Sequence, residues 1–250
     1  MNKNKTELVL VLDRSASMQN CVKETESGAA ELIQDQRSQP GEVAVSYYRF
    51  DSSVEKVYEG VDINEIGAIK VEPRGMTALY DGIGTAIDET GKRLARLPED
   101  QRPGLVIVAI MTDGGENSSC KYTHQTVKQK IEHQTDKYSW QFMFLGANQD
   151  SFLVGGNLGI DASKISNYST NMAQMAFNGT SDVIKAMRGV TAHGGGLEAV
   201  SACGYSDESR EAMSEDFVQK NVGKKDEGIV KRAINNFTAK EDSGSSKVWS

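Results

Sequence analysis

The sequence predicts a doubly wound α/β domain with a mostly parallel central sheet, one antiparallel edge strand and helices on both faces. Two unbroken apolar runs, residues 8–12 and 105–111, are typical of strands that are buried on both faces in a parallel sheet. Segments with helical spacing separate the predicted strands. The residues Phe50-Asp51-Ser52-Ser53 resemble a hairpin turn, so the strand after them is the expected antiparallel edge.

The remaining elements follow from periodicity and turn residues. Pro40-Gly41 ends the first helix, and apolar residues recur at helical spacing from Ile83 to Leu97. The predicted strands are residues 7–12, 43–50, 54–58, 105–111, 140–145 and 165–168. The predicted helices are residues 18–39, 64–69, 78–97, 123–134, 152–158 and 173–190, the last with a break at Asn178-Gly179.

We place one domain at residues 1–192 and a C-terminal extension at residues 193–250. The run His193-Gly194-Gly195-Gly196 has the composition of a linker or a tight turn. The extension is predicted to contain a helix with an acidic face at 207–220, apolar residues at helical spacing in 229–237, and a disordered end at 242–250.

The composition is that of a globular protein with one sizeable core. The chain has 250 residues, 38% hydrophobic and 25% charged, and a formal net charge of -7. This acidic balance argues against nucleic acid or an anionic membrane as a partner. No apolar segment approaches the ~20 residues of a membrane span, and no signal-peptide core follows the start. Its three cysteines form no disulfide framework. We therefore expect a cytoplasmic protein with free thiols, or one carried in a virion. The sequence indicates no oligomeric state.

Oxygen-bearing side chains follow two of the buried strands and precede one helix. Asp13, Ser15 and Ser17 come directly after the first apolar run, Asp113 follows the second, and Thr77 precedes a helix. The carboxyl ends of parallel strands share one edge of the sheet, where α/β folds place ligands. We therefore expect these side chains to converge there. Such oxygen donors suit hard cations such as Mg2+, Ca2+ or Mn2+. The alternative is that they only cap the following helices.

Three segments together carry a resemblance: Asp13-x-Ser15-x-Ser17, Gly75-Met76-Thr77 and Thr112-Asp113-Gly114. In order and spacing they resemble the metal-ion-dependent adhesion site (MIDAS) of the von Willebrand factor type A (vWA) family, whose fold is Rossmann-like. The resemblance covers roughly residues 6 to 190. It implies that Mg2+, or Mn2+ or Ca2+, contacts Ser15, Ser17 and Thr77 directly. It also implies that Asp13 and Asp113 bind the ion directly or through water, and that an Asp or Glu of a partner protein completes the coordination.

The resemblance implies a non-enzymatic, metal-dependent protein-binding module of the adhesion or adaptor kind. One alternative is a structural or assembly component, for example of a virus particle, in which the metal only staples loops. A weaker alternative is a metal-dependent phosphatase or hydrolase. Phosphatases of the haloacid dehalogenase type need a second Asp where Ser15 stands, and the sequence has neither a Gly-x-Ser-x-Gly elbow nor a P-loop.

Other polar residues are expected near the same edge. Asp81 and Asp88, on the helix after Thr77, are expected to be solvated. Glu116 and Asn117 are expected on a loop beside Asp113. They could influence the choice of partner, although ordinary surface polarity accounts for them as well.

Overall fold

A computed structural model describes residues 1–147 and 150–214 of the chain. Its strands are β1 (Asn2–Asp13), β2 (Glu42–Phe50), β3 (Val54–Asp62), β4 (Pro103–Thr112), β5 (Gln141–Gly146) and β6 (Ile165–Asn167). Its helices are α1 (Val22–Arg37), α2 (Leu79–Ala95), α3 (His124–Tyr138), α4 (Ser151–Asn157), α5 (Ala173–Ala192), α6 (Leu197–Ser201) and α7 (Asp207–Ala212).

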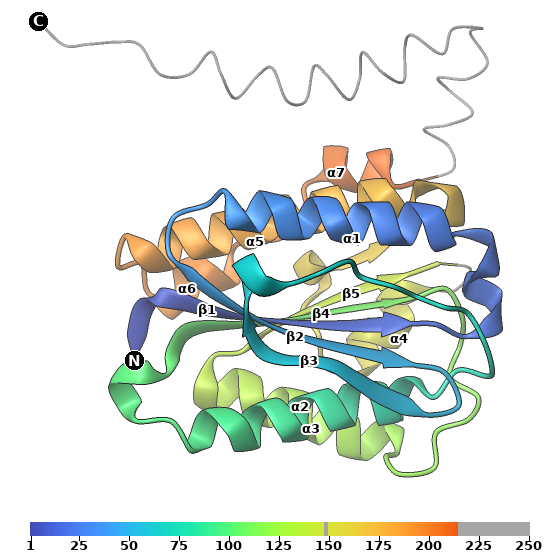
Figure 1. Cartoon of the computed structure of the whole chain (residues 1–250), viewed down its shortest axis with the longest axis horizontal. Coiled ribbons are helices and arrows are strands. Elements are labelled where there is room, and N and C mark those ends of the chain that lie inside the picture. Colours follow the sequence, from blue (N-terminus) through green and yellow to red (C-terminus); the bar gives the residue numbers. More distant parts are fainter. Residues whose placement is uncertain (148–149, 215–250) are drawn as a thin grey trace, which may run out of the picture.

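The described residues form three layers, with the sheet between two layers of helices (Figure 1). The strand order is β3-β2-β1-β4-β5-β6, and every neighbouring pair is parallel except β2 and β3. The predicted doubly wound α/β class, with one antiparallel edge strand, is confirmed. None of the helices in this part of the chain is both long and apolar enough to cross a membrane.

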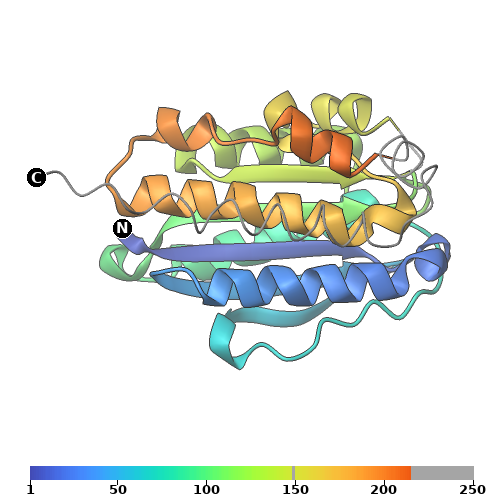
Figure 2. The ribbon, with the colours of Figure 1, turned by 90° about the horizontal axis from the view of Figure 1, so that it is seen from above.

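Strand β1 anchors both halves of the core because its side chains alternate between the two faces of the sheet. Leu8, Leu10 and Leu12 join the apolar cluster under α1 and α5. Val9 and Val11 join the cluster under α2 and α3. All five side chains are at most 1% exposed. Helices α1 and α5 lie side by side along their face of the sheet (Figure 2).

Two helix predictions near the first half of the sheet need correction. The helix predicted at 18–39 is a 3-10 turn at Ala16–Asn20 followed by α1. The helix predicted at 64–69 is wrong, because only a 3-10 turn at Ile63–Glu65 forms there. The Arg37 guanidinium donates hydrogen bonds to the carbonyl oxygens of Ile63 and Ile66. A side chain therefore donates to these carbonyl groups, which in a helix would accept hydrogen bonds from backbone N–H groups.

The break predicted at Asn178-Gly179 is also wrong, because α5 is continuous from Ala173 to Ala192. Gly179 instead allows a close approach of α7. A Cβ atom at this position would collide with the side chains of Met213 and Ser209. The glycine is therefore explained by packing between helices rather than by a helix end.

Residues after 192 contribute to the core of the domain. Val200, Tyr205 and Met213 are buried in the same apolar cluster as α1 and α5. The boundary at residue 192 remains a prediction. Of the helix predicted at 207–220, the described part is α7, which ends at Ala212. The helical spacing predicted in 229–237 and the disordered end predicted at 242–250 lie outside the described residues.

Candidate metal centre

The carboxyl edge of the sheet brings the predicted donor residues together. Strands β1 and β4 are parallel and in register, with Leu12 opposite Met111, so Asp13 and Thr112 end them at the same level. Asp113 follows directly. Thr77 lies two residues before α2, in a loop whose Gly75 carbonyl accepts the N–H of Ala16 at 3.2 Å. Three loops that are distant in sequence therefore meet at this edge.

Two of the three hydroxyl groups lie within contact distance of each other, and one of these two contacts a carboxylate. Ser17 Oγ donates to Asp113 Oδ1 at 2.6 Å, and Ser15 Oγ lies 3.0 Å from Ser17 Oγ. A Cβ atom built at Gly114 would lie 3.5 Å from both Ser17 Oγ and Thr77 Oγ1. The hydroxyls of Ser17 and Thr77 therefore lie near the same point of the backbone, at ordinary van der Waals distance from a Cβ atom there.

Asp13 is a fully buried carboxylate that receives hydrogen bonds from neutral groups. Its Oδ1 accepts the N–H of Ser15 at 2.6 Å, and its Oδ2 accepts the hydroxyl of Thr112 at 2.6 Å. Burial raises the pKa of Asp13 to about 6, which these hydrogen bonds oppose and the nearby charge of Asp113 reinforces. Among the described residues, no Lys, Arg or His nitrogen lies within 4.0 Å of this carboxylate. A cation at this position would compensate its charge.

Asp113 is a second buried carboxylate. It is 3% exposed, and burial raises its pKa although the hydroxyl of Ser17 donates to it. The set as a whole is two carboxylates and three hydroxyls. The described part of the chain contains no group of three or more His, Cys, Asp or Glu that could hold a metal. A metal here would therefore be bound largely by hydroxyl oxygens, which suits a hard divalent cation.

The loop after β4 is fixed to the start of α2 by Glu116 and Asn117, for which the sequence left open an influence on the choice of partner or a place among ordinary polar surface residues. The backbone N–H of Thr77 donates to Asn117 Oδ1 at 2.9 Å, and the N–H of Asn117 donates to the Thr77 carbonyl at 3.0 Å. Glu116 accepts the N–H of Tyr80, in the first turn of α2, at 3.0 Å. Asn117 therefore holds Thr77, and Glu116 holds the first turn of α2, against the loop that follows Asp113.

The expectation that Asp81 is solvated is wrong. Asp81 is 7% exposed and accepts the N–H groups of Cys120, Lys121 and Tyr122 at 3.0, 2.9 and 2.7 Å. Asp88 is only partly exposed and accepts the Tyr122 hydroxyl at 2.8 Å. Both carboxylates therefore hold the loop that leads into α3 against α2, and neither points into the cluster of donor residues.

A buried ion pair connects the same loops from the side of β2. Arg14 is 1% exposed, and its Nε lies 2.9 Å from Asp51 Oδ2, which also accepts Arg74 Nε at 2.8 Å. The backbone adds two contacts, from Arg74 N–H to the Arg14 carbonyl at 2.7 Å and from Ala78 N–H to the Asp51 carbonyl at 2.8 Å. Asp51 therefore contacts both the loop with the two serines and the loop with Thr77.

Comparison with known proteins identifies the fold. No family model matches the sequence, and no curated protein matches it either. Among solved structures, the D319A mutant of the PilB minor pilin from Streptococcus sanguinis is 12% identical, with a TM-score of 0.54, covering 78% of this chain and 64% of that chain. Proximal thread matrix protein 1 (PTMP1) from the mussel byssus is 13% identical, with a TM-score of 0.53, covering 72% of this chain and 45% of that chain.

A second PTMP1 structure, with a zinc-occupied MIDAS motif, is 14% identical, with a TM-score of 0.51, covering 72% of this chain and 46% of that chain. This chain thus spans less than two thirds of the length of these structures. At such identities the similarity concerns the fold. That fold is the vWA fold, as the resemblance of the sequence motifs implied.

Proposed function

We propose that this chain is a metal-dependent protein-binding module that captures an Asp or Glu of a partner protein through a divalent cation. Mg2+ is the proposed ion, with Mn2+ and Ca2+ as alternatives. The proposed ligands, direct or through water for the two carboxylates, are Ser15, Ser17, Thr77, Asp13 and Asp113. One observation carries the proposal. Three loops bring hydroxyls and carboxylates to one point, where buried Asp13 has no cation of the described residues within 4.0 Å.

The residues around the site suit capture of an external group. A cation bound mainly by neutral hydroxyls would keep enough positive charge to attract a carboxylate from outside. Ser17 is exposed, so the site is open to solvent. Met76, directly before Thr77, is 51% exposed and offers an apolar contact beside the site. A partner residue would therefore meet a polar centre with an apolar neighbour. The zinc-occupied MIDAS motif of PTMP1 supports a divalent cation in this fold.

Capture of partners with and without a chelator tests the function. We expect the wild-type chain to co-purify proteins in Mg2+ that are absent in EDTA, with mass spectrometry as the readout. Thr77→Val removes one proposed ligand at almost constant volume and should abolish this capture. Thr90→Val is the matched control, because Thr90 is a buried threonine of α2, the helix that follows Thr77, and is remote in sequence from the three loops. It should capture the same proteins as wild type.

Two results would contradict the proposal. If EDTA does not change the set of captured partners, the result would favour the alternative that this chain is an assembly component. In that case a metal would only hold the loops together. Turnover of generic phosphoesters that Asp13→Asn abolishes would favour a metal-dependent phosphatase or hydrolase.

A further inference from the structure

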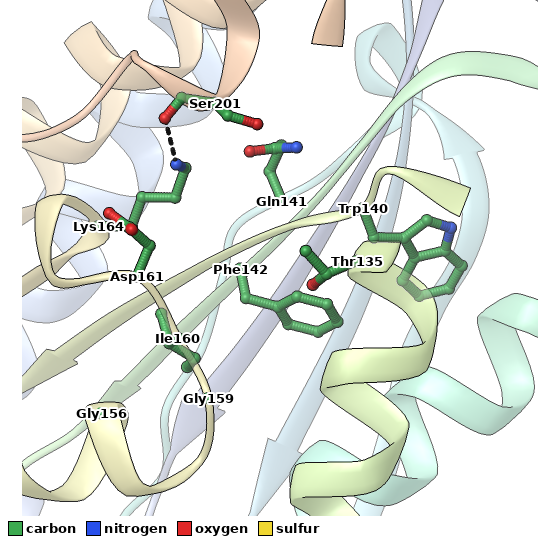
Figure 3. Close-up of a pocket in the computed structure, with 10 residues that line it drawn as sticks. All are labelled: Thr135, Trp140, Gln141, Phe142, Gly156, Gly159, Ile160, Asp161, Lys164 and Ser201. Atoms are coloured by element: carbon green, nitrogen blue, oxygen red, sulfur yellow. Dashed lines mark hydrogen bonds between the residues drawn. The ribbon is translucent and has the colours of Figure 1, made fainter. Parts of the chain in front are cut away.

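A cavity of about 440 Å3 lies beside the start of β5 and the segment that precedes β6 (Figure 3). Its lining includes the first two residues of β5 and several residues that directly precede β6, whereas Asp13 and Asp113 lie at the carboxyl ends of β1 and β4. The volume is in the range of sites that bind small molecules. The cavity is lined by Thr135, Trp140, Gln141, Phe142, Gly156, Gly159, Ile160, Asp161, Lys164 and Ser201.

One wall of this cavity carries a buried positive charge. Lys164 is 4% exposed, and its Nζ donates to the Ser201 carbonyl at 2.8 Å. No carboxylate of the described residues lies within 4.0 Å of Nζ. An ammonium group has three N–H donors, so two remain for another acceptor. Burial lowers the pKa of Lys164, and the charge of Asp161, which is not in contact with Nζ, opposes this shift.

The other side chains decide which anion fits. Phe142, Trp140 and Ile160 are each at most 5% exposed and form apolar walls. Figure 3 shows Lys164, Ser201 and Gln141 at one end of the cavity, with Phe142 and Trp140 further along. Asp161 also lines the cavity, but its carboxylate accepts the N–H and the hydroxyl of Ser163. The negative charge of Asp161 opposes any anion in this cavity, and it opposes dianions and trianions more strongly than a monoanion.

We infer that this cavity binds a small organic monocarboxylate with an apolar body. The carboxylate accepts from the free N–H donors of Lys164, and the apolar body packs against Phe142 and Ile160. The desolvated ammonium then gains the charged hydrogen-bond partner that the described residues do not provide. This site is independent of the proposed cation at the carboxyl edge.

Ligand-detected NMR on the full chain in EDTA tests the site, with benzoate as the probe. We expect saturable binding with a Kd on the order of 1 mM or tighter. Benzamide, which has the same shape without the charge, should bind at least about tenfold more weakly, because charged hydrogen bonds are the stronger ones. Inorganic phosphate should not compete with benzoate.

Lys164→Met should abolish benzoate binding, whereas Lys185→Met should leave it unchanged, because Lys185 pairs with Asp35 on the surface of α5. Equal binding of benzoate and benzamide to wild type would overturn the inference without any variant. Binding of benzoate to folded Lys164→Met as tightly as to wild type would overturn it as well, and so would no saturable binding to wild type. The use of EDTA separates each of these results from failure of the proposed metal centre.

Discussion

The two edges of the sheet bury opposite charges. At the carboxyl edge, Asp13 is fully buried and receives hydrogen bonds from a backbone N–H and a hydroxyl. At the amino edge, Lys164 is buried and donates to a carbonyl. Arg14, by contrast, is a buried charge that is paired with a carboxylate, that of Asp51. Because an uncompensated buried charge costs free energy, each edge is suited to an external partner of the opposite charge.

The largest effect is expected where the buried charges are paired. Asp51→Ala leaves the buried Arg14 guanidinium with only its more exposed partner, Glu55. We expect a loss of about 3 kcal/mol in the free energy of unfolding, measured by urea denaturation. Glu55→Ala is the control and should cost less than about 1 kcal/mol, because Glu55 is 43% exposed. Equal losses would show that Asp51 does not compensate Arg14.

A slightly smaller effect is expected from a cation at the carboxyl edge. Mg2+ at a hundred times its Kd should raise the free energy of unfolding of wild type by about 2.7 kcal/mol, because it binds the folded chain only. Asp13→Asn should gain almost nothing. Lys164→Met should gain as much as wild type, since Lys164 lies at the other edge. A gain in Asp13→Asn equal to that of wild type would contradict the assignment.

A small effect is expected from removing the buried positive charge at the amino edge. Lys164→Met eliminates a buried ammonium that has no carboxylate of the described residues within 4.0 Å. The free energy of unfolding should change by less than about 1 kcal/mol, because the lost hydrogen bond is offset by the removed desolvation cost. A loss near that of Asp51→Ala would mean that Lys164 is compensated within the chain, and the contrast between the two edges would fail.

The smallest effect is a dependence of stability on pH. It contrasts Asp81, whose pKa is lowered, with Asp13, whose pKa is raised. Burial raises the pKa of Asp81, but the N–H groups of Cys120, Tyr122 and Lys121 outweigh burial and hold the pKa below its ordinary value of 3.8. Below pH 3.8 the unfolded chain therefore binds more protons than the folded chain at this residue, so its stabilisation is lost as the pH falls through the folded pKa.

The difference in free energy of unfolding between wild type and Asp81→Asn should thus be constant near neutral pH and shrink below pH 3.8. Urea denaturation at a series of pH values measures it. A difference that does not change with pH would show that the Asp81 carboxylate is not stabilised as described.

The strands and the placement of the donor residues could be predicted because both depend on local pattern. Strands β1 and β4 each contain an unbroken apolar run. The polar residues that directly follow each run therefore lie at the carboxyl edge of the sheet. The roles of Asp81 and Asn117 could not be predicted, because their partners lie about 40 residues away in sequence. The residues next to an aspartate in sequence do not reveal whether its carboxylate accepts N–H groups of a distant loop or is solvated.

The wrong helix predictions have the same physical origin. Gly179 has the sequence of a helix break, but its conformation follows from contact with α7. Residues 64–69 have helical spacing, but Arg37 from α1 binds the carbonyl groups that the helix would need. The cavity at Lys164 left no signal in the sequence, because its walls come from four separate segments between Thr135 and Ser201. Tertiary contacts decide each of these cases.

Calorimetric titration of Mg2+ and of Mn2+ into wild type and Asp13→Ala tests the central claim most directly. Lys164→Met serves as a control that changes the opposite edge, and circular dichroism confirms that each variant is folded. We predict that wild type and Lys164→Met bind one divalent cation per chain at the carboxyl edge and that Asp13→Ala binds none there. Equal binding by wild type and Asp13→Ala would contradict the account.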